Sequence, residues 1–314
     1  MSNKNQNLIV TINLIILLLP QVVMASAKRF HQQHKTVQEI SKDINTPEKK
    51  AAAVAKLINI VKSEKVDVPL KEFAAKKLGQ LHAVEAKELL KSLAVSLEQN
   101  DSTRQLKSIT SLAYWQIRVT QEPTKELQNE LRIKLLRGYE PPYADVVESW
   151  AIDELSNRGV KSALPDIIKT IKSHVSGKSA DAQIKLCTTK IDLLTNNLTR
   201  HEALYKALVM EDNTDQGQQL KKWAIEELGK LDSAESRQIL INFAKELENK
   251  YIDSSGERIR PKGDWLGREA TYLYRSIIKI LKCEGFSNDK IKAKGLKPDK
   301  VFLVDGYDED CGCN

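Results

Sequence analysis

Apolar residues recur every three or four positions along most of the chain, which is the spacing that places them on one face of an α-helix. The first stripe follows Thr46-Pro47-Glu48, where a capping threonine precedes a proline at the first helical position. No stretch alternates with period two for long enough to form a strand, so the pattern predicts an all-α fold. The apolar stripes are Ala51, Val54, Ile58, Val61; Leu70, Phe73, Ala74, Leu78, Leu81; Ala86, Leu89, Leu90, Leu93, Leu97; Leu106, Ile109, Ala113, Ile117; Leu127, Leu131, Leu135; Val147, Trp150, Ala151, Leu155; Ile184, Cys187, Ile191, Leu194; and Leu266, Ala270, Leu273, Ile277, Ile280, Leu281.

Three of these stripes share a motif. They read Phe73-Ala-Ala-Lys-Lys-Leu-Gly-Gln-Leu, Trp150-Ala-Ile-Asp-Glu-Leu-Ser-Asn-Arg and Trp223-Ala-Ile-Glu-Glu-Leu-Gly-Lys-Leu, with starts 77 and 73 residues apart. Degraded units around Leu112 and Leu194 lie between them, which gives leucine spacings of 34, 43, 39 and 34 residues. The segments 70–81 and 86–97 are predicted to pair as a helical hairpin. Trp115, Trp150 and Trp223 lie on or beside the stripes, and we expect them in the core.

The helix ends Ala74–Leu81 and Ala224–Leu231 follow the pattern Ala-x-x-x-Leu-Gly-x-Leu. In this the chain resembles the HEAT-repeat family, including the HEAT-like repeats of the phycobilisome-lyase type, over residues 46 to 250. The resemblance implies an armadillo-like, right-handed α-solenoid of about five to six helix pairs. In such a unit we expect the small residue to let the chain turn and the alanine to let paired helices approach closely.

The first 27 residues are typical of a secretory signal peptide. Lys4 is their only charge, an apolar run from Leu8 to Leu19 ends at Pro20, and small residues fill Ala25-Ser26-Ala27. Cleavage there predicts an exported protein, periplasmic or secreted. The alternative is an uncleaved anchor, because a membrane span needs at least about 17 apolar residues. Residues 28–45 are expected to form a lead or first capping segment.

Charge is concentrated near the C-terminus. The formal charge of +7 becomes +6 without Lys4, and residues 251–300 hold 12 basic against 7 acidic side chains, whereas 301–314 hold four acids and no base. The region divides into a basic loop with a final helix (251–283) and a tail with Cys-Gly-Cys (284–314). An acidic protein is the expected partner, and no nucleic acid is expected for an exported chain. The candidate partner-binding residues are Arg258, Arg260, Lys262, Trp265 and Arg268; the alternative for Trp265 is that it starts the last helix and covers the apolar end of the array.

The four cysteines divide by context. Cys187 lies on an apolar stripe and is expected in the core. In an oxidising compartment a bridge from Cys283 to Cys311 or Cys313 would close a loop of roughly 30 residues and stabilise the fold by about 3 to 4 kcal/mol. The alternative is a soft-metal or redox site formed by Cys311, Cys313 and the acids Asp308, Glu309 and Asp310.

Catalytic motifs are not found in the sequence: it has no nucleophile elbow, phosphate loop, zincin helix or dinucleotide fingerprint. The His201-Glu202 pair is similar to the iron-binding pairs of some HEAT-repeat hydroxylases, but a single pair is more typical of a solvated helix start. No catalytic residue, cofactor or metal is therefore predicted. The sequence favours a non-enzymatic protein-binding scaffold or assembly factor. The alternatives are a polysaccharide lyase with a closed all-helical toroid, or metal and redox handling by the Cys-Gly-Cys tail.

Overall fold

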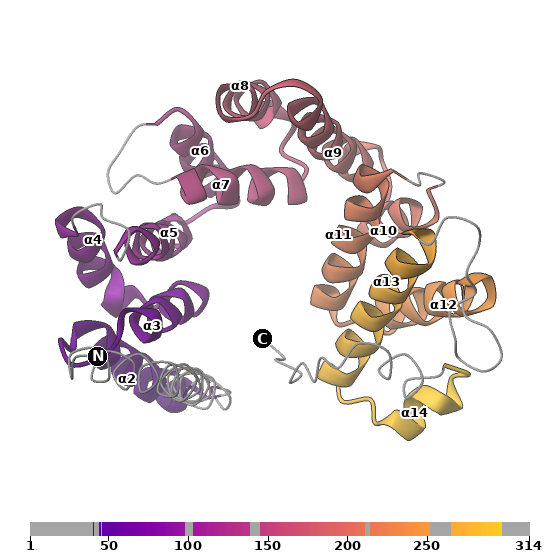
Figure 1. Cartoon of the computed structure of the whole chain (residues 1–314), viewed down its shortest axis with the longest axis horizontal. Helices are drawn as coiled ribbons and strands as arrows, with labels where there is room; N and C mark the ends of the chain where they lie inside the picture. The colour runs from indigo at the N-terminus through magenta and orange to yellow at the C-terminus, as the bar shows by residue number, and fades with distance from the viewer. Residues whose placement is uncertain are drawn as a thin grey trace, which may run out of the picture. The chain divides into compact units, whose positions relative to one another are not determined.

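A computed structural model describes residues 40, 44, 46–97, 103–138, 145–210, 214–251 and 265–296, without the side chains of 250, 251, 265–269 and 271. Every element within these ranges is a helix (Figure 1), which confirms the predicted all-α class. The α-helices are α2 (Pro47–Lys62), α3 (Val68–Gln80), α4 (Lys87–Ser96), α5 (Arg104–Thr120), α6 (Lys125–Leu136), α7 (Asp145–Asn157), α8 (Leu164–His174), α9 (Gly177–Thr195), α10 (Arg200–Val209), α11 (Asp215–Leu231), α12 (Ala234–Tyr251), α13 (Trp265–Cys283) and α14 (Asn288–Ala293), with the short 3-10 helices η1 (Val84–Ala86) and η2 (Lys161–Ala163).

The chain divides into two compact units, with the boundary between Ile152 and Asp153 inside α7. The predicted array from 46 to 250 runs through this boundary. None of the helices within the described ranges is both long and apolar enough to span a membrane. The predicted signal peptide and lead segment lie outside the described residues, apart from isolated positions, so export stays a prediction.

In the first unit, α5 is the main packing partner of both α3 and α4, and α2 packs on the other side of α3. The predicted hairpin between 70–81 and 86–97 is therefore not the dominant pairing, because α5 takes the place of α4 beside α3. Trp115 is fully buried in α5 and contacts the ring of Tyr114 edge-on, with ring centroids 5.1 Å apart. Its prediction as a core residue is confirmed.

In the second unit, α11 is the central helix and packs against α9, α10, α12 and α13. Its buried side chains include Trp223, Ile225 and Leu228, and Tyr274 of α13 is buried beside them in the same apolar cluster. Trp223 is thus a core residue, as predicted, whereas Trp150 in α7 is half-buried.

The three motif segments occupy equivalent places in their helices α3, α7 and α11. In each, the alanine after the aromatic residue and the leucine five positions after it are completely buried. A small residue 13 positions after the aromatic and an aliphatic residue 17 positions after it are completely buried as well. These sets are Ala74, Ala151, Ala224; Leu78, Leu155, Leu228; Ala86, Ala163, Ser236; and Leu90, Ile167, Leu240.

The turn that ends each of these helices has the same backbone geometry. His82, Gly159 and Asp232 lie nine residues after the aromatic, and all three have positive φ, at 50°, 67° and 42°. The next helical element begins two residues later in every case, at Val84, Lys161 and Ala234. Because the left-handed conformation reverses the chain at one residue, it sets where the second helix starts. The three segments therefore share one pattern of buried positions and one turn geometry.

The small residue of the motif has a different role from the expected one. Gly79 and Gly229 are not among the glycines of positive φ. Instead, a Cβ on Gly79 would stand 2.8 Å from Cα of Ala113 in α5, and one on Gly229 would stand 2.9 Å from Cγ2 of Ile280 in α13. The glycines allow close helix contact, and the turn is made three residues later.

The intermediate units also need correction. Leu112 and Leu194 are only half-buried, whereas Leu193 is buried and lies four residues before Asn197, which has φ of 51°. The same four-residue spacing joins Leu78 to His82, so Leu193 is the equivalent position.

Two predicted stripes are placed differently by the structure. Ala51 and Leu127 are exposed. The buried side of α2 instead consists of Ala53, Val54, Leu57 and Val61.

Candidate functional site

The predicted partner-binding residues lie in the segment before α13 and in its first turn. Arg258, Arg260 and Lys262 lie outside the described residues. Trp265 and Arg268 lie in the first turn of α13, in agreement with a helix starting at Trp265, but their side chains are outside the described part. This surface remains a prediction.

Cys187 and Cys283 lie within the described ranges, and they differ in their bonding. Cys187 is a free, buried thiol on α9, which confirms it as a core residue. Cys283 at the end of α13 is disulfide-bonded. The pairing with Cys311 or Cys313 concerns residues outside the described part and stays a prediction, as does the alternative metal or redox site there.

The His201-Glu202 pair stands at a helix start, as predicted. Thr199 and Glu202 form a capping box at the N-terminus of α10, and this hydrogen bonding lowers the pKa of the exposed Glu202. His201 is half-buried; its Nε2 lies 3.0 Å from Oγ of Ser233, and its Nδ1 lies 3.6 Å from a carboxylate oxygen of Glu235. The imidazole therefore links α10 to the turn before α12 and to the first turn of α12. Within the described residues, no group of side chains could hold a metal ion.

The most unusual side chain in the second unit is Lys190 on α9, a lysine with only 7% of its surface exposed. Its Nζ donates a hydrogen bond of 3.1 Å to Oδ1 of Asn157, the last residue of α7. The same amine lies 5.4 Å from the ring centroid of Trp223 on α11, which is within cation–π range. Lys190 thus joins three helices of the unit.

The electrostatics around this amine are strongly perturbed. Burial lowers the pKa of Lys190, and the nearby Asp153 carboxylate works against this shift. Asp153 keeps an exposed surface, but the helices around it displace enough water to raise its pKa, opposed by Lys190. Burial also raises the pKa of the Cys187 thiol, against a hydrogen bond from Ser156 that lowers it. Perturbed groups of this kind cluster at functional sites and in structural ion networks.

A second buried ion group adjoins the first. Glu227 on α11 is buried and pairs with Arg200 of α10 and with Lys230, whose Nζ lies 2.7 Å from Oε1. Arg200 also donates a hydrogen bond of 3.4 Å to the backbone oxygen of Asn157. Lys190 and Arg200 therefore both contact Asn157 at the C-terminal end of α7, where the helix dipole favours positive charge.

An amine with a lowered pKa can act as a base or a nucleophile. Lys190 is poorly placed for this, because it is 7% exposed and its amine contacts Asn157 and Trp223. The arrangement is better suited to clamping helices together. In the first unit, the guanidinium of the buried Arg132 lies 5.4 Å from the ring centroid of Trp150. Trp150 and Trp223 occupy the same repeat position, so a buried cation over this aromatic recurs.

Lys190 was not identified from the sequence, because lysines on helices with 29% charged residues are usually solvated. A signal was present: Lys190 lies three residues after Cys187 and four before Leu194, inside the apolar stripe. A charged residue at such a position marks a buried ion contact.

No family model, no curated protein and no solved structure matches this chain.

Proposed function

We propose that the protein is a HEAT-like, right-handed α-solenoid of about five to six helix pairs that acts as a non-enzymatic, protein-binding scaffold or assembly factor. The observation that carries this proposal is the equivalence of the three units in buried positions and in turn geometry. Repeated helix pairs stack into long surfaces that suit extended protein partners and do not require a central catalytic pocket.

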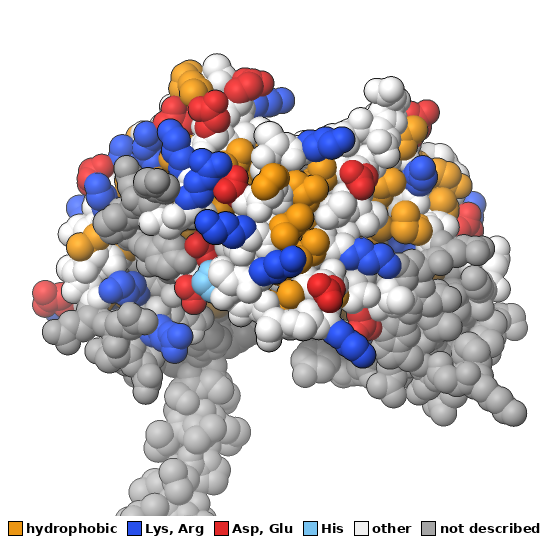
Figure 2. Space-filling view, turned by 90° about the horizontal axis from the view of Figure 1, so that it is seen from above, with side chains coloured by type: hydrophobic (Ala, Val, Ile, Leu, Met, Phe, Trp, Pro, Cys, Tyr) orange, Lys and Arg blue, Asp and Glu red, His pale blue; other side chains and the backbone are white. Residues whose placement is uncertain are grey.

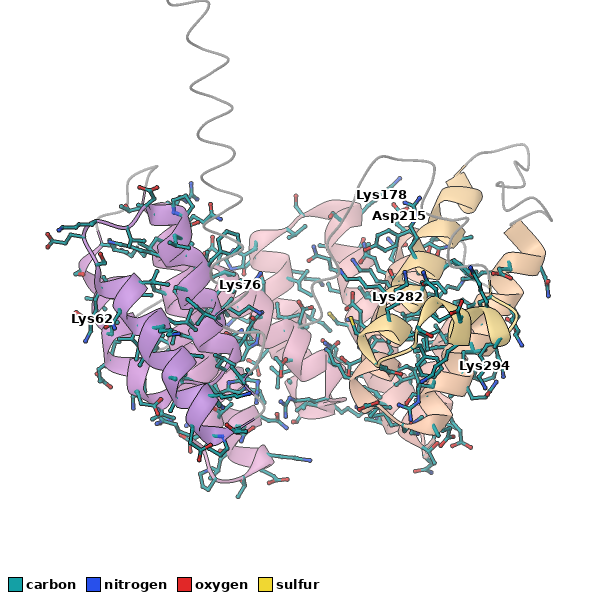
Figure 3. The ribbon with its side chains drawn as sticks, turned by 90° about the horizontal axis from the view of Figure 1, so that it is seen from below. Lys62, Lys76, Lys178, Asp215, Lys282 and Lys294 are labelled. Atoms are coloured by element: carbon teal, nitrogen blue, oxygen red, sulfur yellow. The ribbon has the colours of Figure 1, made fainter. Side chains whose placement is uncertain are left out.

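Exposed positions support the same interpretation. In the repeat helices, the residue three positions after the aromatic is exposed in every unit: Lys76, Asp153 and Glu226. Lys76 is marked in Figure 3. These side chains are all charged but differ in sign, so the fold keeps the position exposed while its chemistry varies. A scaffold that recognises one specific partner needs such variable positions on a constant frame.

The mixed charge of the surface argues for a protein partner over a nucleic acid. On the face that Figure 2 shows, Lys and Arg side chains lie among Asp and Glu side chains, with hydrophobic side chains between them. A nucleic-acid-binding surface would need a continuous basic stripe to follow the phosphates. We further propose that the chain is exported, on the basis of residues 1–27.

Photo-crosslinking tests the proposal. A photoreactive amino acid is placed at Lys76 or at Glu226, and at the exposed Lys206 on α10 as the matched control outside the repeat position. We expect one and the same envelope protein to be captured at Lys76 and Glu226 and not at Lys206. Capture of different proteins at the two repeat positions would contradict a scaffold, and release of unsaturated sugars from an anionic polysaccharide would establish the lyase alternative instead.

A further inference from the structure

Helices α11 and α13 lie side by side in the second unit (Figure 1) and run in the same direction. Nζ of Lys222 lies 5.2 Å from the ring centroid of Tyr272, and seven residues further along α11 Gly229 abuts Ile280 of α13. From the first contact to the second, the chain moves seven residues along α11 and eight along α13. The exposed rows of the two helices are therefore parallel.

Each helix contributes a row of exposed side chains, and we call the two rows together the α11–α13 ridge. On α13 the row consists of Tyr272, Lys279 and Cys283, and Tyr272 is 46% exposed although it is a large aromatic. On α11 the row consists of Lys222, Glu226 and Lys230. Three lysines therefore flank a single exposed carboxylate in these rows, and the buried Glu227, which pairs with Lys230, is also paired with Arg200. The ridge carries positive charge beside an exposed ring.

The disulfide-bonded Cys283 stands at one end of this ridge. Cys187 is a free thiol, and the remaining cysteines of the chain are Cys311 and Cys313. The predicted bridge from Cys283 to Cys311 or Cys313 would attach one of those two residues to the end of the α13 row. The four acids of the tail precede them directly: Asp305, Asp308, Glu309 and Asp310.

The length and the charge of the tail both suit the α11–α13 ridge. An extended segment of residues 305–310 spans about 20 Å, and the helix from Tyr272 to Cys283 spans about 17 Å. The ridge carries three lysines and one glutamate, a charge of +2, and residues 301–314 contain four acids and no base, a charge of −4. The tail matches the ridge in both reach and sign.

We propose that residues 305–310 dock on the α11–α13 ridge as a tethered acidic segment, anchored by the Cys283 disulfide. The carboxylates approach Lys222, Lys230 and Lys279, so the tail competes for this surface with any acidic protein. The inference rests on the described ridge and on the disulfide, and does not depend on the proposed scaffold function.

Carbodiimide cross-linking of the full, oxidised chain tests the docking, because this reagent joins only carboxylates and amines that are already in contact. We expect links from residues 305–310 to Lys222, Lys230 or Lys279. No link is expected to Lys178, an equally exposed lysine of the same unit that Figure 3 marks. The docking is wrong if links form only to residues next to the anchor, such as Lys282 and Lys290, or do not form.

Reduction of the disulfide supplies an independent measurement. Docking holds the tail cysteine near Cys283, so the variant with Asp305→Asn, Asp308→Asn, Glu309→Gln and Asp310→Asn should be reduced by glutathione more readily, by roughly fivefold at low salt, as three exposed ion pairs would give. The difference should vanish at high salt. Equal reduction of the two proteins at low salt would overturn the proposal. The proposal would also be overturned if a poly-glutamate peptide bound the wild type as tightly as the variant. The ridge would then be open to a separate partner in the wild type.

Discussion

Replacing Gly79 or Gly229 by alanine tests whether the small residue of the repeat serves helix contact. Both glycines have helical backbone conformations, so alanine introduces no strain in φ. The new Cβ at Gly79 would stand 2.8 Å from Cα and 2.9 Å from Cβ of Ala113, which belong to the fixed part of α5. At Gly229 it would stand 2.9 and 3.0 Å from Cγ2 and Cδ1 of Ile280, which are side-chain atoms.

The two substitutions share one gain and differ in cost. Alanine is favoured over glycine in a helix by about 1 kcal/mol. Overpacking costs about 1 to 3 kcal/mol, and the upper part of this range applies at Gly79, where a backbone must move. We therefore expect Gly79→Ala to destabilise the first unit by about 1 to 2 kcal/mol. Gly229→Ala should change stability by about zero, because the half-buried Ile280 side chain can rotate away.

Urea unfolding followed by far-ultraviolet circular dichroism measures both effects. The neighbouring exposed residue supplies the control, since Gln80→Ala should shift the free energy of unfolding by less than about 0.5 kcal/mol. If Gly79→Ala is more stable than the wild type, the glycine is not required for the contact between α3 and α5. If both glycine variants lose the same amount, the distinction between backbone and side-chain contacts is wrong.

Four further substitutions test the core and the buried charges. Leu78→Asp and Leu228→Asp should each cost more than about 4 kcal/mol, because each places an unpaired charge at a completely buried position; a folded, cooperative variant in thermal unfolding would refute the stacking of these helices. Lys190→Ala should destabilise by about 2 to 3 kcal/mol through lost packing on Trp223 and an unpaired Asn157, whereas the exposed Lys185→Ala should be nearly neutral in the same denaturation assay. Glu284 directly follows α13, and burial raises the pKa of its carboxyl, against Arg237, whose Nη1 lies 3.7 Å away. The charged form is therefore penalised in the folded state, and this cost is present above the folded pKa and disappears as pH falls through it. Glu284→Gln should raise the melting temperature at pH 7 and lose that advantage at acidic pH, and an advantage independent of pH would contradict the raised pKa.

The helical class and the motif shared by three helices were readable from the sequence because both depend on local patterns. The period of apolar residues identifies helices, and the aromatic–Ala–Leu motif identified units whose buried positions coincide. Thr46 caps α2 as predicted, with its side chain accepting a hydrogen bond from the amide of Lys49. These features involve residues close in the chain.

Features that depend on distant residues were missed. The partner of α3 is α5 because Gly79 fits against Ala113, and no local pattern indicates this contact. The left-handed turns at His82 and Asp232 were hidden because neither residue is a glycine, although Gly159 occupies the same position in the second unit. Lys190 and Arg132 are buried, and a tryptophan from another helix lies over each cation.

Small-angle X-ray scattering of the mature, oxidised chain tests most directly whether the repeated units stack into an open solenoid. A compact globule of this length has a radius of gyration of about 20 Å. An open array of helix pairs is predicted to give a clearly larger value, with a distance distribution extended along one direction. A radius of gyration at or below the globular value would contradict the solenoid and, with it, the proposed role as an extended protein-binding surface.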